Sequence, residues 1–207
     1  MFDISNIIAE IWGYPLSYAE LIGTVFGLIC VYLASRENVL TWPAGIVNEL
    51  FFFVIFFQVH LYANMFLQVI FFFSTMYGWY KWKNDRGGDE SVTRMVFREV
   101  AIFSLAAVVL TGITGYLISH VNQYFPRYFE KASYPYIDSL VMVLSVIATI
   151  LLARKKLENW VLWVIIDVIS VILYFLQGVY FIALEYLILL GIASFGLFNW
   201  TKKMNNG

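Results

Sequence analysis

This chain of 207 residues has few charged residues and a single cysteine, and each shortage excludes some classes of protein. Only 13 % of the residues are charged, while 61 % are apolar and 19 % are aromatic. Soluble domains carry about 25 % charged residues. Cys30 is the single cysteine, so no disulfide within the chain, CxxC motif or cysteine metal cluster can form. No soluble core absorbs this much apolar surface, and we therefore expect the solvent to be lipid.

Motifs for catalysis and cofactor binding are also missing. The sequence contains no phosphate-binding glycine-rich loop, no HExxH and no GxSxG. These absences argue against ATP as an energy source, a metal site and an intramembrane hydrolase. The basic loop around Arg86 is too short and too poor in aromatic residues for a nucleic-acid module. We therefore expect no enzyme activity, no cofactor, no metal and no nucleic-acid partner.

Seven apolar stretches are long enough for membrane-spanning helices, each of which needs about 20 mostly apolar residues. They cover residues 17–35, 41–58, 61–82, 98–119, 136–153, 159–176 and 180–201. The sequence therefore predicts an all-α membrane protein with seven transmembrane helices.

The residues before the first stretch have a different pattern. Met1–Trp12 lacks the basic start and the small-residue cleavage site of a signal peptide. Its isoleucines recur at helical spacing, at Ile4, Ile7, Ile8 and Ile11. This spacing predicts a short amphipathic helix that lies along the membrane interface.

Lysine and arginine gather in alternate loops, and this sets the predicted orientation. With the N-terminus outside, eleven of the 13 basic residues lie in cytoplasmic segments. They are Arg36; Lys81, Lys83, Arg86, Arg94 and Arg98; Arg154, Lys155 and Lys156; and Lys202 and Lys203. Only Arg127 and Lys131 fall outside. The positive-inside rule therefore predicts an N-out, C-in topology.

The second half of the chain repeats the first at a fixed offset of 118 residues, without a gap. The matched pairs are Tyr18 and Tyr136, Glu20 and Asp138, Leu33 and Leu151, Arg36 and Arg154, Trp42 and Trp160, Glu49 and Asp167, Tyr62 and Tyr180, Gly78 and Gly196, and Trp82 and Trp200. Chance matching of aromatic-rich segments is the alternative, but it does not readily place charged residues in register. A repeated hydrophobic unit is typical of a transporter whose two halves enclose one site.

The repeat and the topology together predict a 3+1+3 arrangement. One helix lies between two three-helix units, so both units cross the membrane in the same direction. The repeats are therefore parallel, as in the SWEET architecture. We expect residues 1–83 to form the first unit with its interfacial helix, 84–120 a linker and the fourth transmembrane helix, and 121–207 the second unit.

Three acids, Glu49, Asp167 and Glu185, lie well inside the apolar stretches, and no lysine or arginine lies at such depth. A charge at the bilayer centre costs about 2.5–3.5 kcal/mol, and such residues usually face a cavity. The acids must therefore be protonated, hydrated in a cavity, or matched by a cationic ligand. A protonated acid that bonds to a neighbouring helix is the structural alternative for each.

The sixth stretch carries polar and aromatic residues along one face. Their spacing is three or four residues: Trp160, Trp163, Asp167, Ser170, Tyr174 and Gln177. Indoles can stack on a flat cation, a contact worth up to about 2 kcal/mol when desolvated, while the carboxylate pairs with its polar edge. We therefore expect Trp160, Trp163, Asp167 and Tyr174 to contact a substrate. An aromatic belt at the membrane interface is the alternative, above all for Trp160.

Three amides extend this candidate site. Asn64 and Gln68 lie four residues apart in the third stretch, and Asn48 precedes Glu49 in the second. An amide pair suits a bound amide or a ribose. Hydrogen bonding between helices is the alternative for all three.

Several segments resemble the PnuC family of bacterial vitamin transporters. They are ENWVLWVIIDVISVIL (Glu158–Leu173), LQGVYFIALEYLIL (Leu176–Leu189), WPAGIVN (Trp42–Asn48), LYANMFLQV (Leu61–Val69) and YGWYKW (Tyr77–Trp82). The resemblance covers essentially the whole chain. It implies a 3+1+3 fold in the bacterial inner membrane, a homotrimer with one substrate site in each protomer, and uptake by facilitated diffusion. It also implies a cytoplasmic kinase that traps the product.

The resemblance leaves two substrates open, because the family includes nicotinamide riboside transporters and a thiamine branch called PnuT. Asp167 stands where the riboside pattern has Asn, and Phe195 replaces another Asn. A carboxylate can accept a hydrogen bond from an aminopyrimidine and neutralise a thiazolium, so these departures favour thiamine, with nicotinamide riboside as the alternative. A lipid-modifying enzyme and a structural assembly protein are the alternatives of another class. They do not account for the repeat-related acids at mid-depth.

Overall fold

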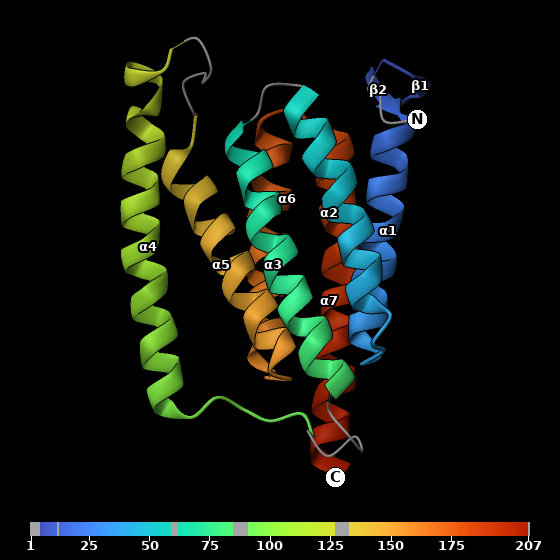
Figure 1. Cartoon of the computed structure of the whole chain (residues 1–207), viewed down its shortest axis with the longest axis vertical. Coiled ribbons are helices and arrows are strands. Elements are labelled where there is room, and N and C mark those ends of the chain that lie inside the picture. The colour runs from blue at the N-terminus through green and yellow to red at the C-terminus, as the bar shows by residue number, and fades with distance from the viewer. Residues whose placement is uncertain (1–4, 12, 59–61, 85–90, 127–132, 207) are drawn as a thin grey trace.

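Helices form nearly all of the described structure. The computed structural model describes residues 5–11, 13–58, 62–84, 91–126 and 133–206, and these ranges contain seven helices and one hairpin (Figure 1). The helices are α1 (Tyr18–Ser35), α2 (Thr41–Gln58), α3 (Tyr62–Asn84), α4 (Phe97–Tyr124), α5 (Pro135–Ala153), α6 (Glu158–Leu176) and α7 (Tyr180–Asn206). Each coincides with one predicted apolar stretch to within a few residues. The predicted helical content and its placement along the chain are confirmed.

The predicted interfacial helix at the N-terminus is wrong for the residues described. Strands β1 (Ile7–Ile11) and β2 (Tyr14–Ser17) pair there as an antiparallel hairpin. Gly13 permits the turn, because its φ of 79° lies in the left-handed region that favours glycine. A helix this short is marginal in itself, so strand pairing overrides the helical spacing of the isoleucines. Residues 1–4 and Trp12 lie outside the described residues.

The hairpin leads directly into α1, whose first turn is closed by its own side chains. Ser17 Oγ accepts a hydrogen bond from Glu20 N at 3.2 Å, and Ser17 N donates to Glu20 Oε2 at 2.9 Å. This reciprocal capping box satisfies two backbone donors that a helix start leaves free. It therefore fixes where the backbone turns into the membrane helix.

Six helices form a closed ring, and α4 stands outside it. Around the ring, α1 packs on α2, α2 on α3, α3 on α5, α5 on α6, α6 on α7, and α7 on α1. Helix α4 packs on α5 at one edge of the molecule (Figure 1). In this order a half-turn about the ring centre exchanges α1 with α5, α2 with α6 and α3 with α7, as the predicted repeat requires.

The turns that follow α1 and α5 have the same backbone hydrogen bonds. The matched bonds are Asn38 N to Leu33 O (3.0 Å) and Lys156 N to Leu151 O (2.9 Å), and Thr41 N to Asn38 O (3.0 Å) and Asn159 N to Lys156 O (3.1 Å). Glu37 and Lys155 occupy equivalent positions and both have a positive φ, 54° and 49°. Each atom pair is offset by 118 residues, so these turns support the predicted repeat.

A tryptophan lies over a glycine at matched places in the two halves. Trp42 packs edge-on against Trp82 with 5.2 Å between ring centroids, and Trp160 packs against Trp200 at 5.7 Å. A Cβ atom on Gly78 would lie 2.2 Å from the Trp42 ring, and one on Gly196 would lie 2.7 Å from the Trp160 ring. Only glycine leaves room for these rings, and the contact joins α2 to α3 and α6 to α7.

Six of the described helices are long and apolar enough to cross a membrane: α1, α2, α4, α5, α6 and α7. Helix α3 is 23 residues long and packs between α2 and α5, but Asn64, Gln68 and two lysines in its last turn make it more polar. That α3 is a seventh span stays a prediction.

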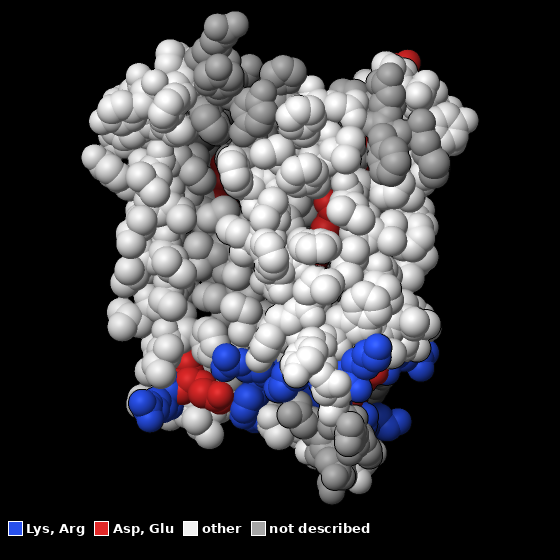
Figure 2. All heavy atoms as spheres, viewed as in Figure 1, with Lys and Arg blue, Asp and Glu red and all other residues white. Residues whose placement is uncertain are grey.

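Basic side chains gather at one end of the molecule (Figure 2). At mid-height the surface is almost free of charge, apart from acidic atoms seen in recesses between the helices. This distribution is the one that the predicted N-out, C-in orientation requires. Of the residues counted for that orientation, Arg86, Arg127 and Lys131 lie outside the described residues.

The tight glycine contact leads to a first prediction. Gly196→Ala should lower the free energy of unfolding by about 1–3 kcal/mol, because the added methyl overpacks the buried Trp160 ring. Gly191→Ala, in the same helix, is the matched control, since nothing lies within 4 Å of its added Cβ. Thermal unfolding of the purified variants in detergent, followed by circular dichroism, measures the difference. Equal midpoints for the two variants would contradict the proposed packing role of Gly196.

Candidate functional site

Glu49 lies on α2 within the first three-helix unit and is held there by a neighbour. It is only 7 % exposed, and its Oε1 accepts a 2.5 Å hydrogen bond from Thr75 Oγ1 on α3. Its Oε2 is buried without a described partner. One half of the carboxylate is therefore satisfied by the protein itself.

Asp167 is the equivalent acid of the second unit, and it lacks the partner that Glu49 has. It is 2 % exposed, and its carboxylate forms no hydrogen bond with any residue that the structure describes. Ala193, itself buried, stands at the position on α7 that matches Thr75 on α3. Because a methyl group donates no hydrogen bond, the repeat leaves this second carboxylate available to a ligand.

Hydroxyl and aromatic groups surround Asp167 between α6 and α7. The rings of Tyr174 and Tyr186 stack with 5.5 Å between centroids and 12° between planes. The Tyr186 hydroxyl lies near Ser170 and near Asp167. Tyr186 of α7 thus stands beside the stripe on α6 that carries Asp167, Ser170 and Tyr174, and the stripe did not include it.

Glu185 continues this group toward α1. It precedes Tyr186 on α7 and lies within hydrogen-bonding range of Thr24 on α1. Tyr186 and Thr24 are the residues that the sequence analysis missed. The sequence did contain a signal for both residues. Tyr186 directly follows the predicted acid Glu185, and Thr24 lies four residues after Glu20 on the same helical face.

At the outer end of the same region, Tyr14 of the hairpin reaches across to α7. Its ring stacks on Phe181 with 5.2 Å between centroids, and its hydroxyl donates to Glu20 Oε1 at 2.5 Å. Burial, followed by this hydrogen bond to the Glu20 carboxylate, raises the pKa of Tyr14 above its ordinary value. Glu20 is therefore occupied by Tyr14 and by the cap of α1.

The two predicted tryptophans differ in their surroundings. Trp160 is 1 % exposed and lies inside a hydrophobic cluster with Trp200, and its Nε1 has no described hydrogen-bond partner. Trp163 is only partly buried at the border of that cluster, one turn nearer to Asp167. Of the two, Trp163 is the better placed to meet a ligand, whereas the placement of Trp160 favours packing.

The three predicted amides are not brought together. Asn48 Nδ2 donates to Gly23 O at 2.8 Å and so joins α2 to α1, which is the structural alternative considered for it. On α3, Asn64 is exposed and Gln68 is half-buried, and neither forms a hydrogen bond with a described residue. Their contact with a substrate stays a prediction.

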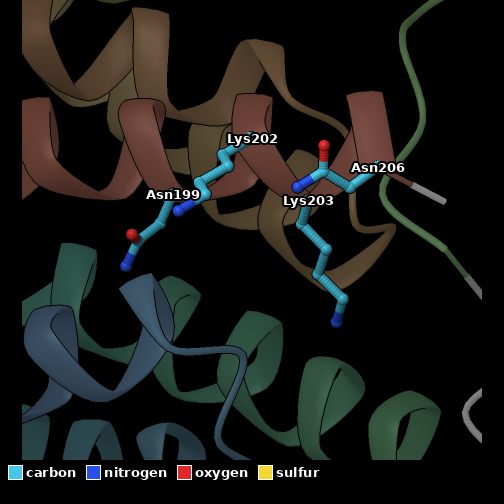
Figure 3. A pocket seen from close by; sticks show the side chains of 4 residues that line it. All are labelled: Asn199, Lys202, Lys203 and Asn206. Atoms are coloured by element: carbon cyan, nitrogen blue, oxygen red, sulfur yellow. The ribbon is translucent and has the colours of Figure 1, made fainter.

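Two hollows lie near the ends of the helices. One, of about 480 Å³, is lined by Asn199, Lys202, Lys203 and Asn206 of α7. In Figure 3, Asn199 and Lys203 extend from α7 toward the ribbon where α1 ends, in agreement with the 2.9 Å ion pair between Lys203 Nζ and Glu37 Oε2. The other, of about 200 Å³, is lined at the opposite end by Tyr14 and Phe181, among others.

The contrast between the two acids yields a second prediction. Thr75→Val should destabilise the protein by about 1–3 kcal/mol, because Glu49 would be left buried without its donor. Thr114→Val on α4 is the matched control, since that exposed hydroxyl bonds only to Leu110 O of its own helix. Midpoints of thermal unfolding in detergent compare the two. A Thr75→Val midpoint no lower than that of Thr114→Val would show that Glu49 does not depend on this bond.

Known proteins resemble the chain over most of its length. The sequence profile described as nicotinamide mononucleotide transporter matches residues 17–202. The nicotinamide riboside transporter PnuC of Escherichia coli strain K12 is 38 % identical, over 96 % of this chain and 93 % of that protein. The riboflavin/roseoflavin transporter RibM of Streptomyces davaonensis is 26 % identical, over 88 % of this chain and 84 % of that protein.

A solved structure agrees with the fold. A crystal structure of the vitamin B3 transporter PnuC superposes with a TM-score of 0.68 and 19 % sequence identity, covering 91 % of this chain and 82 % of that one. The family and this structural neighbour are transporters and not enzymes. With its long apolar helices and the match of the profile across nearly all of them, the chain belongs to the nicotinamide mononucleotide transporter (PnuC) family, as a multi-pass protein of the bacterial inner membrane.

Proposed function

We propose that this protein carries nicotinamide riboside across the inner membrane by facilitated diffusion. The 38 % identical relative is a nicotinamide riboside transporter, and its similarity extends over 96 % of the chain. That relationship covers nearly the whole chain, whereas the preference for thiamine rested on two positions, Asp167 and Phe195. It therefore favours the riboside, which was the alternative in the sequence analysis, over thiamine. The 26 % identical relative is a riboflavin/roseoflavin transporter, and this similarity also supports a vitamin as the substrate.

The observation that carries the proposal is the buried carboxylate of Asp167 with no described partner. In the described helices the basic side chains lie near helix ends, whereas Asp167 lies at the middle of α6, and no ion pair to Asp167 is formed by a described residue. Nicotinamide riboside is a flat cation with a carboxamide. The carboxylate can offset the ring charge and accept from the carboxamide N–H. The hydroxyls of Ser170 and Tyr186, which lie beside it, can donate to the carboxamide oxygen.

Aromatic side chains complete the proposed site. Trp163 and Tyr174 lie on α6, as Asp167 does, and Tyr186 of α7 stacks on Tyr174. A desolvated cation over an aromatic face gains up to about 2 kcal/mol. Glu185 extends the acidic surface, and the amides Asn64 and Gln68 remain candidates for the ribose. Glu49 and Asn48 are more simply internal partners of Thr75 and Gly23.

The arrangement in the membrane belongs to the same proposal. We infer seven spans with α3 included, two parallel three-helix units of the SWEET type, and an N-out, C-in orientation. The units correspond to residues 1–83 and 121–207, with 84–120 between them, and the ring order and the matched turns support this division. The homotrimer and the cytoplasmic kinase that traps the product rest on the resemblance to the family.

The third prediction concerns flux. Liposomes that contain the pure protein should take up labelled nicotinamide riboside until the inner and outer concentrations are equal, with or without a pH gradient. Liposomes without protein are the control. Accumulation above the outside concentration would reject facilitated diffusion. Unlabelled nicotinamide riboside should compete better than thiamine or riboflavin, and a reversed order would overturn the substrate assignment.

The fourth prediction concerns Asp167. Asp167→Ala should weaken binding of nicotinamide riboside by about tenfold or more, since the carboxamide N–H then loses its acceptor and a charge-assisted bond is worth about 1.5–3 kcal/mol. Glu10→Ala is the matched control, because Glu10 is an exposed acid on β1. Titration calorimetry gives the affinities, and the midpoint of thermal unfolding reports whether both variants are folded. Unchanged affinity in folded Asp167→Ala protein would remove Asp167 from the site.

A further inference from the structure

The two halves of the ring meet along two seams, which a perfect two-fold repeat would make equivalent. One seam joins α3 to α5, and the other joins α7 to α1. Trp82 near the end of α3 and Trp200 on α7 are repeat-related, as are Ala153 and Ser35, the last residues of α5 and α1. A comparison of these matched groups shows where the repeat is broken.

The α3–α5 seam is fastened at the end where the basic residues lie. Trp82 Nε1 donates to Ala153 O at 3.2 Å, and Lys155 Nζ lies 5.5 Å from the centroid of the Trp82 ring. Beside this seam, the segment before α4 is tied to the turn after α5, because Thr93 N donates to Lys155 O at 3.1 Å and Leu157 N donates to Thr93 O at 2.9 Å. Separating α3 from α5 would break the buried hydrogen bond of Trp82.

The α1–α7 seam has no such fastening among the described residues. Trp200 is fully buried, yet its Nε1 has no hydrogen-bond partner, whereas the matched Trp82 has one. A 2.9 Å ion pair crosses the seam between Glu37 and Lys203, whose side chains are 12 % and 62 % exposed. Arg36 also lies over the Phe195 ring at 5.4 Å. Ion pairs this close to water contribute little to stability.

The two hollows lie at the two ends of α7. The larger, of about 480 Å³, lies beside Lys203 at the basic end (Figure 3). The smaller, of about 200 Å³, lies between the hairpin that precedes α1 and the start of α7, where Tyr14 stacks on Phe181. Between them, Thr24 of α1 faces Glu185 of α7. The contacts across the seam are therefore side-chain contacts along its length.

We propose that the α1–α7 seam is the one that opens to the cytoplasm during transport, with the Glu37–Lys203 pair as its gate and the α3–α5 seam as the hinge. The inference rests on the proposed transport function and adds the place at which the pathway opens. Opening here exchanges an exposed ion pair for hydrated groups and lets water reach the unpaired Trp200 N–H. Opening at α3–α5 would instead break the buried hydrogen bond from Trp82 to Ala153 O.

Reversible cross-linking tests the gate. Glu37→Cys and Lys203→Cys are combined in a Cys30→Ala background, which removes the native thiol, and a short bis-methanethiosulfonate joins the pair. Uptake of nicotinamide riboside into liposomes should fall by more than about tenfold, since the inward-open state is no longer populated. Dithiothreitol should restore it. The matched control is Glu99→Cys with Lys156→Cys, an ion pair of 3.2 Å between the start of α4 and the turn after α5, which spans neither seam and whose cross-linking should leave uptake unchanged.

A second readout needs no transport. A charged maleimide added to the cytoplasmic side, with nicotinamide riboside present, should label Ser35→Cys about tenfold faster than Ala153→Cys, because labelling follows the open population of each seam. Equal or reversed labelling, or equal inhibition by the two cross-links, would overturn the gate assignment. Absence of uptake in the protein before cross-linking would instead refute the proposed function, and the labelling experiment would still decide which seam opens.

Discussion

The absence of water in the hydrocarbon layer is the constraint on which the rest of this structure depends. Each polar group that enters the layer must find its partner inside the protein. The helices satisfy the backbone, and short side-chain bonds satisfy much of the rest, as in Asn48 to Gly23 O and Thr41 to Cys30 O. Some buried atoms keep no described partner, among them Glu49 Oε2 and the indole N–H groups of Trp160 and Trp200. Asp167 differs from Glu49 in that neither of its oxygens is bonded to a described residue, which is why we propose it as a ligand contact.

The duplicated units use this constraint in different ways. Matched tryptophans and glycines pack α2 on α3 and α6 on α7 in the same geometry, so the repeat preserves what holds each unit together. The polar positions have diverged. Where the first unit has Thr75 to bond its acid, the second has Ala193, so only one of the two acids keeps an internal donor. Divergence at one helix contact is therefore the basis on which we propose a structural role for Glu49 and a binding role for Asp167.

The helices could be predicted from the sequence because lipid makes long apolar runs unambiguous, and α2 begins and ends where its apolar run does. The hairpin could not, because the isoleucine spacing of a short segment fits a helix as well as a strand, and pairing with residues 14–17 decided between them. For the candidate site, the spacing on α6 correctly placed Asp167 and Tyr174 on one helix, with Asp167 at its middle, while their contact with a substrate stays a prediction. Tyr186 and Thr24 required knowledge of which helices are neighbours, and periodicity within one helix does not contain it.

Burial of Trp160 also shows the limit of a stripe. Its spacing places Trp160 on the same face of α6 as Asp167. At that end of α6, however, Gly196 lets α7 pack directly against the Trp160 ring, so the ring is buried inside the protein. A related difference separates the two seams of the ring. Trp82 on α3 donates across its seam to Ala153 O, whereas the matched Trp200 on α7 has no described hydrogen-bond partner. As with Thr75 and Ala193, α3 makes a hydrogen bond that α7 lacks, and the proposed opening at α1 and α7 follows from that difference.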